Sequence, residues 1–571
     1  MKQHHGPISG IDTAGPLVAT AGYDNQVLLW DGAGAAIAGA RHEHLANQCR
    51  FSPSGRLLVS ASSDYSARVW SVPTLTPVAR LGGHGDDVEM AVFSPDEKQV
   101  ATASRDRCVR IFDAASGAMQ ACLEGHRADV IAVEWSAAGA ELVSSGDDGT
   151  IRRFDARTGA ALETTDLDGV EADTVVCGPP GTFFVGTDGG DIVTLRGGLR
   201  VATRAHASGI KRLLFQASSN TLLSASYDRR VKLWQVGTDG ALALRRDFTA
   251  PAVVWLRCAA FVGSTAIVFG TFGSRYARFD RARSDWDLTG VQDTASLNAV
   301  RCFEGAVVTV GDAGVVRRDE RVARRLGSLC NFLVEFDGRL LTGGHLGQLF
   351  DALSGEVLYR HHSPLNCGAV FRRDGVAHVA IGSYTGQCMV LRHGPGRTLE
   401  LVTVLRPHDN AIKGIAANDE TLFTVCATGA AAFIAIASLT RERLLPRAHE
   451  RISNGAALLA DGGFASVSRD RLLRLWHGEH VRTITTPHSH SIKCVAVCPH
   501  SGLVATGAYN GMLAIYDARA DSWIKVTQPT SAGISSLAPG PDAGTFLASA
   551  YDGQVLTIAA SSGRLQPRLC P

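Results

Sequence analysis

The sequence predicts an all-β protein built from repeats, and three observations predict it. A phrase made of Ser or Thr, an Asp four residues later and an aromatic residue six further on returns at intervals of about forty residues. An apolar, strand-like run with a His ahead of it precedes the phrase, as His84 precedes Val88–Pro95. Weaker, glycine-rich copies fill the gaps between the strong ones. The strong copies are Thr20…Asp24…Trp30, Ser60…Asp64…Trp70, Thr102…Asp106…Phe112, Ser144…Asp148…Phe154, Ser224…Asp228…Trp234 and Ser466…Asp470…Trp476.

These repeats closely resemble those of the WD40 family. In that family the loop His, the Ser or Thr, the turn Asp and the Trp form a hydrogen-bonded tetrad that holds the strands of one blade together. The resemblance implies three complete tetrads: His5, Thr20, Asp24 and Trp30; His206, Ser224, Asp228 and Trp234; and His449, Ser466, Asp470 and Trp476. Other repeats keep a part: His84 with Phe112, His126 with Phe154, and His490, Thr506 and Asn510 with Tyr516. A Phe or Tyr in place of Trp packs but lacks the indole N–H.

Counting the weak copies gives fourteen repeats of about 41 residues each. A propeller ring usually has four to eight blades, so two rings are expected rather than one. We therefore predict two tandem seven-bladed WD40-type β-propellers with about fourteen four-stranded blades, residues 1–285 and 286–571. Each blade should come from contiguous sequence, with at most the tail Gly563–Cys570 crossing between the rings; that tail is long enough to form the outer strand of the last blade.

Composition limits the classes of function. Hydrophobic residues make up 45% of the chain, with no apolar run long enough to span a membrane and no leader at Met1, which predicts a soluble protein. The thirteen cysteines occupy strand positions and favour reduced thiols in a cytoplasmic protein. A formal net charge of +1 disfavours a nucleic-acid surface, which normally carries a basic excess. The dense charge run at 317–325 is expected on a solvated outer strand, with an anionic partner as the alternative.

The residues immediately before the turn Asp are the main candidates for a functional site. In a WD40-like ring the turns that carry them should encircle the mouth of the central channel. They are Tyr23, Arg105, Asp147, Tyr227 and Phe272 in the first ring, and His345, Tyr384, Arg469, Tyr509 and Tyr551 in the second. Because Tyr and Arg are enriched at interface hot spots, we expect them to contact a partner. The alternative is that this position simply tolerates exposure beside a tight turn.

Three lysines share one register at the start of the predicted inner strands: Lys211, Lys413 and Lys493. They should lie near the same mouth, where an acidic partner segment would pair with them. Ile-Lys pairs are also frequent in WD40 repeats, so family consensus is the alternative explanation.

Metal and catalytic motifs are not indicated. The segment His488–Cys498 has two His and two Cys, but their spacing is shorter than that of zinc motifs. His490 is assigned to a tetrad, and His362 is assigned to the loop-His position of its repeat. No nucleophile elbow, phosphate loop or HExxH segment occurs. We expect no metal and no cofactor.

The resemblance implies a non-catalytic scaffold, monomeric, that binds proteins or peptide segments at the channel-mouth faces. Two alternatives stay open: an enzyme with a site at a channel mouth, and a propeller that binds nucleic acid or another polyanion.

Overall fold

The computed structural model describes residues 2–394, 396, 398–560 and 566–568. These residues form fourteen antiparallel sheets of four strands, each made of four consecutive strands, and one short 3-10 helix at Ala217–Ser219. The all-β fold of four-stranded blades predicted from the repeats is confirmed. Among the described residues, no helix is both long enough and apolar enough to cross a membrane. We number the sheets as blades 1–14 along the chain.

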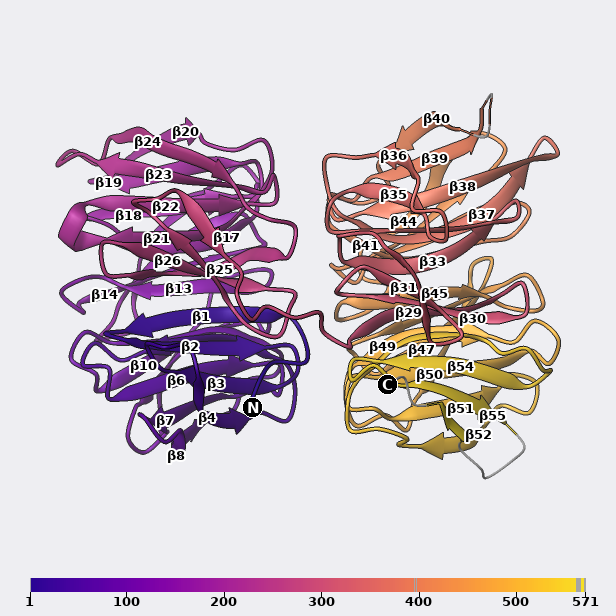
Figure 1. Ribbon diagram of the computed structural model, residues 1–571, viewed down its shortest axis with the longest axis horizontal. Coiled ribbons are helices and arrows are strands. Elements are labelled where there is room, and N and C mark those ends of the chain that lie inside the picture. The colour runs from indigo at the N-terminus through magenta and orange to yellow at the C-terminus, as the bar shows by residue number, and fades with distance from the viewer. Residues whose placement is uncertain (1, 395, 397, 561–565, 569–571) are drawn as a thin grey trace. The chain divides into compact units, whose positions relative to one another are not determined.

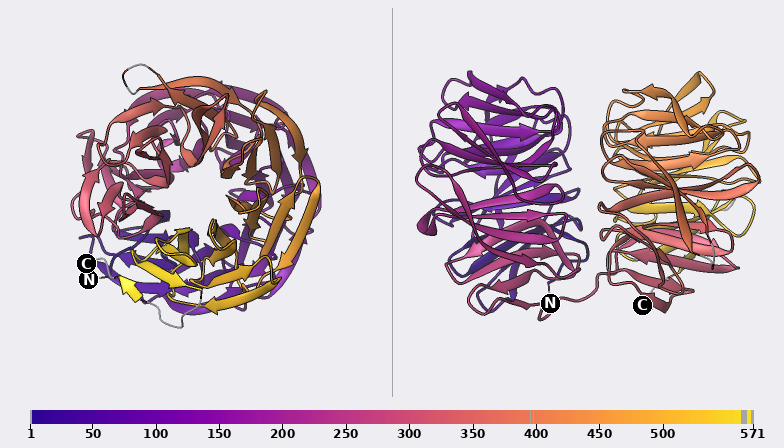
Figure 2. Two further views of the ribbon diagram at one scale, coloured as in Figure 1. Left: turned by 90° about the vertical axis from the view of Figure 1, so that its right-hand side faces the viewer. Right: turned by 90° about the horizontal axis from the view of Figure 1, so that it is seen from above.

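Two compact units divide the chain, Met1–Thr294 and Ala295–Pro571. The first holds blades 1–7 and the second holds blades 8–14. Figures 1 and 2 show the strands of each unit arranged around an axis. The innermost and outermost strands of the first unit are β1 (Ile8–Ala14) and β4 (Ala36–Arg41), β5 (Ala46–Phe51) and β8 (Thr76–Leu81), β9 (Val88–Phe93) and β12 (Met119–Leu123), β13 (Val130–Trp135) and β16 (Ala161–Asp166), β17 (Ala172–Cys177) and β20 (Leu199–Arg204), β21 (Ile210–Gln216) and β24 (Leu242–Thr249), and β25 (Val254–Val262) and β28 (Asp285–Asp287).

The second unit repeats this order. Its innermost and outermost strands are β29 (Leu297–Phe303) and β32 (Arg321–Arg325), β33 (Cys330–Phe336) and β36 (Val357–Arg360), β37 (Leu365–Arg373) and β40 (Leu399–Leu405), β41 (Ile412–Ala417) and β44 (Thr440–Leu445), β45 (Ser453–Leu458) and β48 (His480–Thr485), β49 (Ile492–Val497) and β52 (Ser522–Thr527), and β53 (Ile534–Pro539) and β56 (Gln566–Arg568). The charge run at 317–325 spans β31 (Val315–Arg318) and β32, and β32 is exposed along its length.

Blade 2 shows how the sequence builds a blade. The inner strand β5 and the next strand β6 (Leu57–Ser62) are buried almost throughout, because neighbouring blades cover both of their faces. The outer strand β8 carries mostly exposed residues. The turn between β6 and β7 (Ala67–Ser71) requires Tyr65 at φ 65°, in the left-handed region.

Each ring closes by packing rather than by exchange of a strand. In the first unit Ile8 and Trp30 of blade 1 pack with Cys258 and Val268 of blade 7. In the second unit, Leu297 of blade 8 joins a cluster with Leu547 and Val555 of blade 14. The prediction of contiguous blades is confirmed: β56, from the predicted tail, pairs with β55 (Val555–Ala559) of the same blade, and the rest of Gly563–Cys570 lies outside the described residues.

The chain between the units lies close to the boundary expected from the repeats. The boundary predicted after residue 285 falls at β28, which pairs with β27 (Ala277–Asp280) and completes blade 7. The two compact units meet at Thr294 and Ala295.

Candidate functional site

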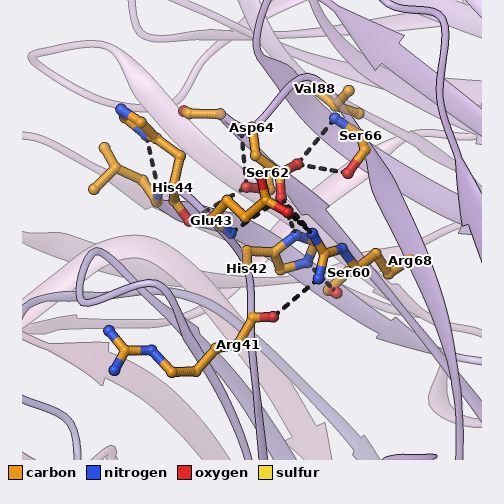
Figure 3. Close-up of polar contacts among 12 residues, drawn as sticks. Arg41, His42, Glu43, His44, Ser60, Ser62, Asp64, Ser66, Arg68 and Val88 are labelled. Atoms are coloured by element: carbon orange, nitrogen blue, oxygen red, sulfur yellow. Dashed lines mark hydrogen bonds and ion pairs between the residues drawn. The ribbon is translucent and has the colours of Figure 1, made fainter. Parts of the chain in front are cut away.

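The tetrads are the most regular polar feature of the blades. In blade 2, His42 Nε2 lies 2.7 Å from Ser60 Oγ, and the Nε1–H of Trp70 donates to the same oxygen at 2.8 Å. His42 Nδ1 lies 2.9 Å from Asp64 Oδ2, as Figure 3 shows for the His, Ser and Asp. Burial lowers the pKa of His42, so the imidazole is neutral, donates from Nδ1 to the carboxylate and accepts at Nε2 from the hydroxyl. Although burial opposes it, the hydrogen bonds from His42 and Ser66 hold the pKa of Asp64 below its usual range.

The same arrangement occurs in blade 6, where Ser224 Oγ lies 2.8 Å from His206 Nε2 and 2.9 Å from Trp234 Nε1. It occurs again in blade 12 among His449, Ser466, Asp470 and Trp476. Blades 3 and 4 keep the His, the hydroxyl and the Asp, with Phe112 and Phe154 in place of Trp. The resemblance did not assign a tetrad to blade 2.

Three loop histidines differ from the expected ones. In blade 1 the hydrogen-bonded residue is His4, whose Nε2 lies 2.8 Å from Thr20 Oγ1, whereas His5 is exposed and gives only its backbone N–H to Asp24. Adjacent side chains of an extended segment point to opposite sides, so only one of the two can face the hydroxyl.

The other two corrections have related causes. His488, not His490, lies 2.8 Å from Thr506 Oγ1, at the eighteen-residue separation that also joins His42 to Ser60. His490 Nδ1 contacts Asn510 instead. In blade 10, His361 rather than His362 makes the hydrogen bond, to Gln387 Oε1 at 2.8 Å. Spacing to the strand hydroxyl was the signal that distinguishes His488 from His490.

One backbone hydrogen bond fixes the position before the turn in every blade. The N–H of that residue donates to the carbonyl of the residue directly before the inner strand, at 2.9 Å from Tyr23 to Pro7 and 3.0 Å from His345 to Leu329. The same bond joins Arg105 to Asp87, Asp147 to Asp129, Tyr227 to Gly209, Phe272 to Val253, Tyr384 to Pro364, Arg469 to Ile452, Tyr509 to Ser491 and Tyr551 to Gly533. It also places Ser63, Asp188, Asp312 and Ala427 at this position. We call this position the mouth position, because these turns and the loops into the inner strands lie at one end of each ring.

In the first unit, ion pairs form among the residues at and around the mouth positions. Arg105 Nε lies 2.5 Å from Glu89 Oε1, and its Nη1 lies 2.5 Å from Asp129 Oδ2. Arg257 of blade 7 reaches Glu89 of blade 3 at 2.8 Å, so this pair joins blades that are not neighbours. The Arg257 guanidinium also lies over the rings of Tyr23 and Trp255.

Carboxylates gather on blades 3–5 of this mouth. They are Asp87, Glu89, Asp129, Asp147, Glu171, Asp173 and Asp188. Burial, with the negative charges of Glu171 and Asp129, raises the pKa of Asp147 well above its usual range. Burial is the larger of these causes, and the neighbouring carboxylates add to it.

Two predicted contact residues of the first unit have partners within the unit. Lys211 contacts Asp173 and lies 2.6 Å from Asp188 Oδ1, with its ammonium 4.7 Å from the centre of the Tyr227 ring. Its charge is therefore already matched, and it is not available as predicted to an acidic partner. Phe272 is only 4% exposed and stacks on Trp255 with ring centres 5.3 Å apart. Its burial contradicts the expectation of an exposed contact, because Trp255 covers it.

In the second unit, amides replace many of these charges. The second residue of the inner strand is Asn in four blades, and its Nδ2 donates to the carbonyl of the first residue of the inner strand in the next blade. The bonds run from Asn298 to Cys330 at 3.1 Å, Asn331 to Leu365 at 2.8 Å, Asn366 to Ile412 at 2.6 Å and Asn454 to Ile492 at 2.7 Å. This side chain therefore links adjacent blades without a charge.

Cations and aromatic rings occupy the rest of this mouth. The Lys413 ammonium lies 4.4 Å from the centre of the Tyr384 ring, and the Arg469 guanidinium lies 5.6 Å from that of Tyr509. The rings of Tyr509 and Tyr551 stack at 6.3 Å. The carboxylate at a mouth position here is Asp312, which is 4% exposed and whose pKa burial raises to about 6.

A family model decides what these repeats are. The model described as WD domain, G-beta repeat matches residues 1–31, 41–71, 75–113, 117–155, 198–235 and 478–517. The chain carries WD40 repeats. Five of the matched segments lie in the first unit and one in the second. No curated protein matches the chain.

The inner strands also carry charged residues that the sequence analysis did not single out. One residue of each inner strand pairs with the Ser or Thr of the tetrad. In the first unit the residue that follows it is Asp12 in blade 1, Arg50 in blade 2 and Glu134 in blade 4. Arg50 pairs with Glu134 at 3.3 Å, again between blades that are not neighbours. At the equivalent position of the inner strand, five of the seven blades of the second unit have alanine: Ala369, Ala416, Ala457, Ala496 and Ala538. Only the pairing register identifies these positions as equivalent.

Proposed function

We propose that the protein is a non-catalytic interaction scaffold whose two channel mouths bind partner segments of opposite charge. One observation carries the proposal. Tyr, Arg and Lys gather around the mouth position of both units, but carboxylates surround them in the first unit, whereas amides and further cations surround them in the second. The shared position supports one mode of binding, and the charges support two different partners.

The mouth of the first unit favours a basic segment. The carboxylates on blades 3–5 outnumber Arg105, Lys211 and Arg257, which pair with them. A Lys or Arg side chain from a partner would meet this excess of carboxylates. The rings of Tyr23 and Tyr227 stand beside this region, with the Arg257 guanidinium over the first and the Lys211 ammonium over the second.

The mouth of the second unit favours an acidic segment. Lys413, Lys493 and Arg469 lie around this mouth, where the one carboxylate at a mouth position is the buried Asp312. Tyr384, Tyr509 and Tyr551 add aromatic area beside these cations. Occupation of both mouths by one partner would raise its apparent affinity without any new contact.

The buried His, Ser and Asp of the tetrads support a structural role for those residues rather than a catalytic one. They resemble a hydrolytic triad in composition, but Ser60 is 0% exposed and its oxygen already accepts the indole N–H of Trp70. A nucleophile must be reachable by its substrate and have a free lone pair. The tetrad therefore has the residues of a triad without the access that the chemistry needs.

The test uses two fluorescent peptides, one rich in Lys and Arg and one rich in Asp and Glu, with binding measured by anisotropy. Glu171→Lys should weaken binding of the basic peptide about tenfold, and Lys413→Glu with Lys493→Glu should weaken binding of the acidic peptide by a similar factor. Each change should leave the other peptide unaffected. The matched controls are Asp239→Lys and Arg519→Glu, whose residues are exposed in turns at the opposite end of their blades.

The proposal fails if neither peptide binds, or if the control variants lower affinity as much as the mouth variants. Binding of the acidic peptide that survives the double lysine change would exclude the second mouth as its site. Binding of duplex DNA by the second unit with a steep salt dependence would favour the polyanion alternative instead.

A further inference from the structure

Two cysteines and a glutamate meet on the outer part of blade 3, away from the channel. Cys108 directly precedes β11 (Val109–Asp113), Cys122 lies in β12 and Glu124 follows it. The two strands pair so that Val109 faces Leu123 and Arg110 faces Cys122. Since side chains alternate along a strand, Cys108 and Cys122 project from the same face of the hairpin.

The three side chains converge. Their thiol sulfurs and carboxylate oxygen all lie within 4.8 Å of one another. Cys122 and Glu124 are exposed and Cys108 is half-buried, so an ion can reach the group from solvent. Among the described residues, no other set of three His, Cys, Asp or Glu side chains comes this close together.

We propose that Cys108, Cys122 and Glu124 form a binding site for a soft divalent cation, with Zn²⁺ as the best match. Two thiolates and one carboxylate are ligands that zinc prefers, and a water molecule would complete the tetrahedron. With Zn–S distances of about 2.3 Å, two sulfurs on one tetrahedral ion lie about 3.8 Å apart. The group would therefore need to contract by about 1 Å at most, and its two exposed side chains have room to do so.

The charges around the site favour a cation. Glu124 brings a carboxylate to the site, and Asp106 lies two residues before Cys108, where Arg110 Nη1 pairs with it at 2.5 Å. Metal binding by two thiols releases their protons, because zinc binds the thiolate form.

The site was not visible in the sequence, because Cys108 and Cys122 stand far apart compared with the cysteine pairs of zinc motifs. The hairpin between β11 and β12 brings them together. No part of this inference depends on the channel mouths or on the proposed scaffold function.

The test titrates the reduced full-length protein with Co²⁺ and then with Zn²⁺ under anaerobic conditions. Co²⁺ should give the thiolate-to-metal charge-transfer absorption, and Zn²⁺ should abolish it at one equivalent. Cys108→Ser and Cys122→Ser should each remove the absorption, and Glu124→Gln should weaken Zn²⁺ binding about tenfold. Cys302→Ser, at a half-buried cysteine of the second unit, is the matched control and should bind like the parent.

Two results would overturn the proposal. One is a charge-transfer band that persists in the Cys108→Ser, Cys122→Ser double variant, which would place the ion elsewhere. The other is a reduced parent protein that binds no Zn²⁺. If the two cysteines of that protein then form a disulfide in air, they are a redox pair and not a metal site. Circular dichroism of each variant verifies that the blades remain folded, so a lost band reports the ligands.

Discussion

The two units place their mouth residues with the same backbone hydrogen bond but hold them with different interactions. In the first unit ion pairs such as Arg105–Glu89 and Arg257–Glu89 span the mouth, and some of them join blades that are not neighbours. In the second unit the inner-strand asparagines donate to the next blade around the ring, and Asn298 donates in addition to Asp312 of its own blade. The shared backbone hydrogen bond therefore fixes where a mouth-position residue lies, whereas a few positions of the inner strands determine the charges around it.

The tetrads follow the same division. Complete tetrads occur in blades 1, 2 and 6 of the first unit and in blade 12 of the second. In blade 11, by contrast, His408 contacts Thr424 Oγ1 at 2.9 Å while its buried Nδ1 has no partner among the described residues. The first unit is therefore braced by more buried polar networks, each of which is costly to interrupt.

The largest expected effect comes from interrupting one complete tetrad and one incomplete one. His206→Ala should lower the free energy of unfolding of the first unit by about 2–4 kcal/mol, because Ser224 and Asp228 lose a buried partner. His408→Ala should lower that of the second unit by only about 1 kcal/mol, because a single hydrogen bond is lost. Hydrogen exchange resolved by peptide measures each unit separately.

His5→Ala serves as the control for this pair of variants, because the exposed His5 side chain stands outside the network that His4 makes. It should leave exchange in blade 1 unchanged. If His206→Ala and His408→Ala lower the free energy of unfolding equally, a complete tetrad stabilises its unit no more than an incomplete one. The two units would then not differ in stability through their tetrads.

The fold was predictable because its signal repeats. The strong copies each supply a buried hydroxyl, a carboxylate at the turn and an aromatic ring, and these residue types recur at fixed spacing. The weak copies were still countable, since turns such as Gly186–Gly190 keep their glycines for the left-handed backbone at Gly190. The choice between adjacent histidines was less predictable, because a one-residue change in the loop decides which ring faces inward.

The sequence predicts which residues stand directly before the turn, but it predicts only some of their side-chain contacts. The mouth position of Tyr23 and Tyr509 follows from the turn, which local sequence specifies. The engagement of Lys211 by Asp173 and Asp188, and the covering of Phe272 by Trp255, depend on residues from neighbouring blades. Pairing across blades has no local signature in one sequence.

Acidification should change the stability of the two units in opposite directions. Asp312 has a folded-state pKa of about 6, above its usual 3.8, so its contribution to the stability of the second unit is fully present below about pH 4 and is lost as the pH rises through 6. Although burial opposes it, contacts with His4 lower the pKa of Asp24 to about 2, so its contribution to the first unit is present above pH 4 and is lost as the pH falls toward 2.

Asp312→Asn tests this sign. The amide keeps an oxygen for the N–H of Asn298 and removes the buried charge, so the second unit should gain about 2 kcal/mol at pH 7 and lose its pH dependence between 4 and 6. Thermal unfolding across this range, followed unit by unit through hydrogen exchange, measures the effect. A destabilised variant at pH 7 would mean that the ionised carboxylate contributes more than its burial costs.

The smallest expected effect concerns the amide links of the second unit. Asn454→Ala removes the bond to the carbonyl of Ile492 and should lower the free energy of unfolding of the second unit by about 1 kcal/mol, with faster exchange at the inner strands β45 and β49. Asn454→Ser should retain part of that stability, because Ser9 makes the equivalent bond to Ala46 in the first unit at 2.6 Å. If the alanine and serine variants exchange at the same rate, the amide contributes through packing alone. The two units would then differ at this position in charge but not in how adjacent blades are linked.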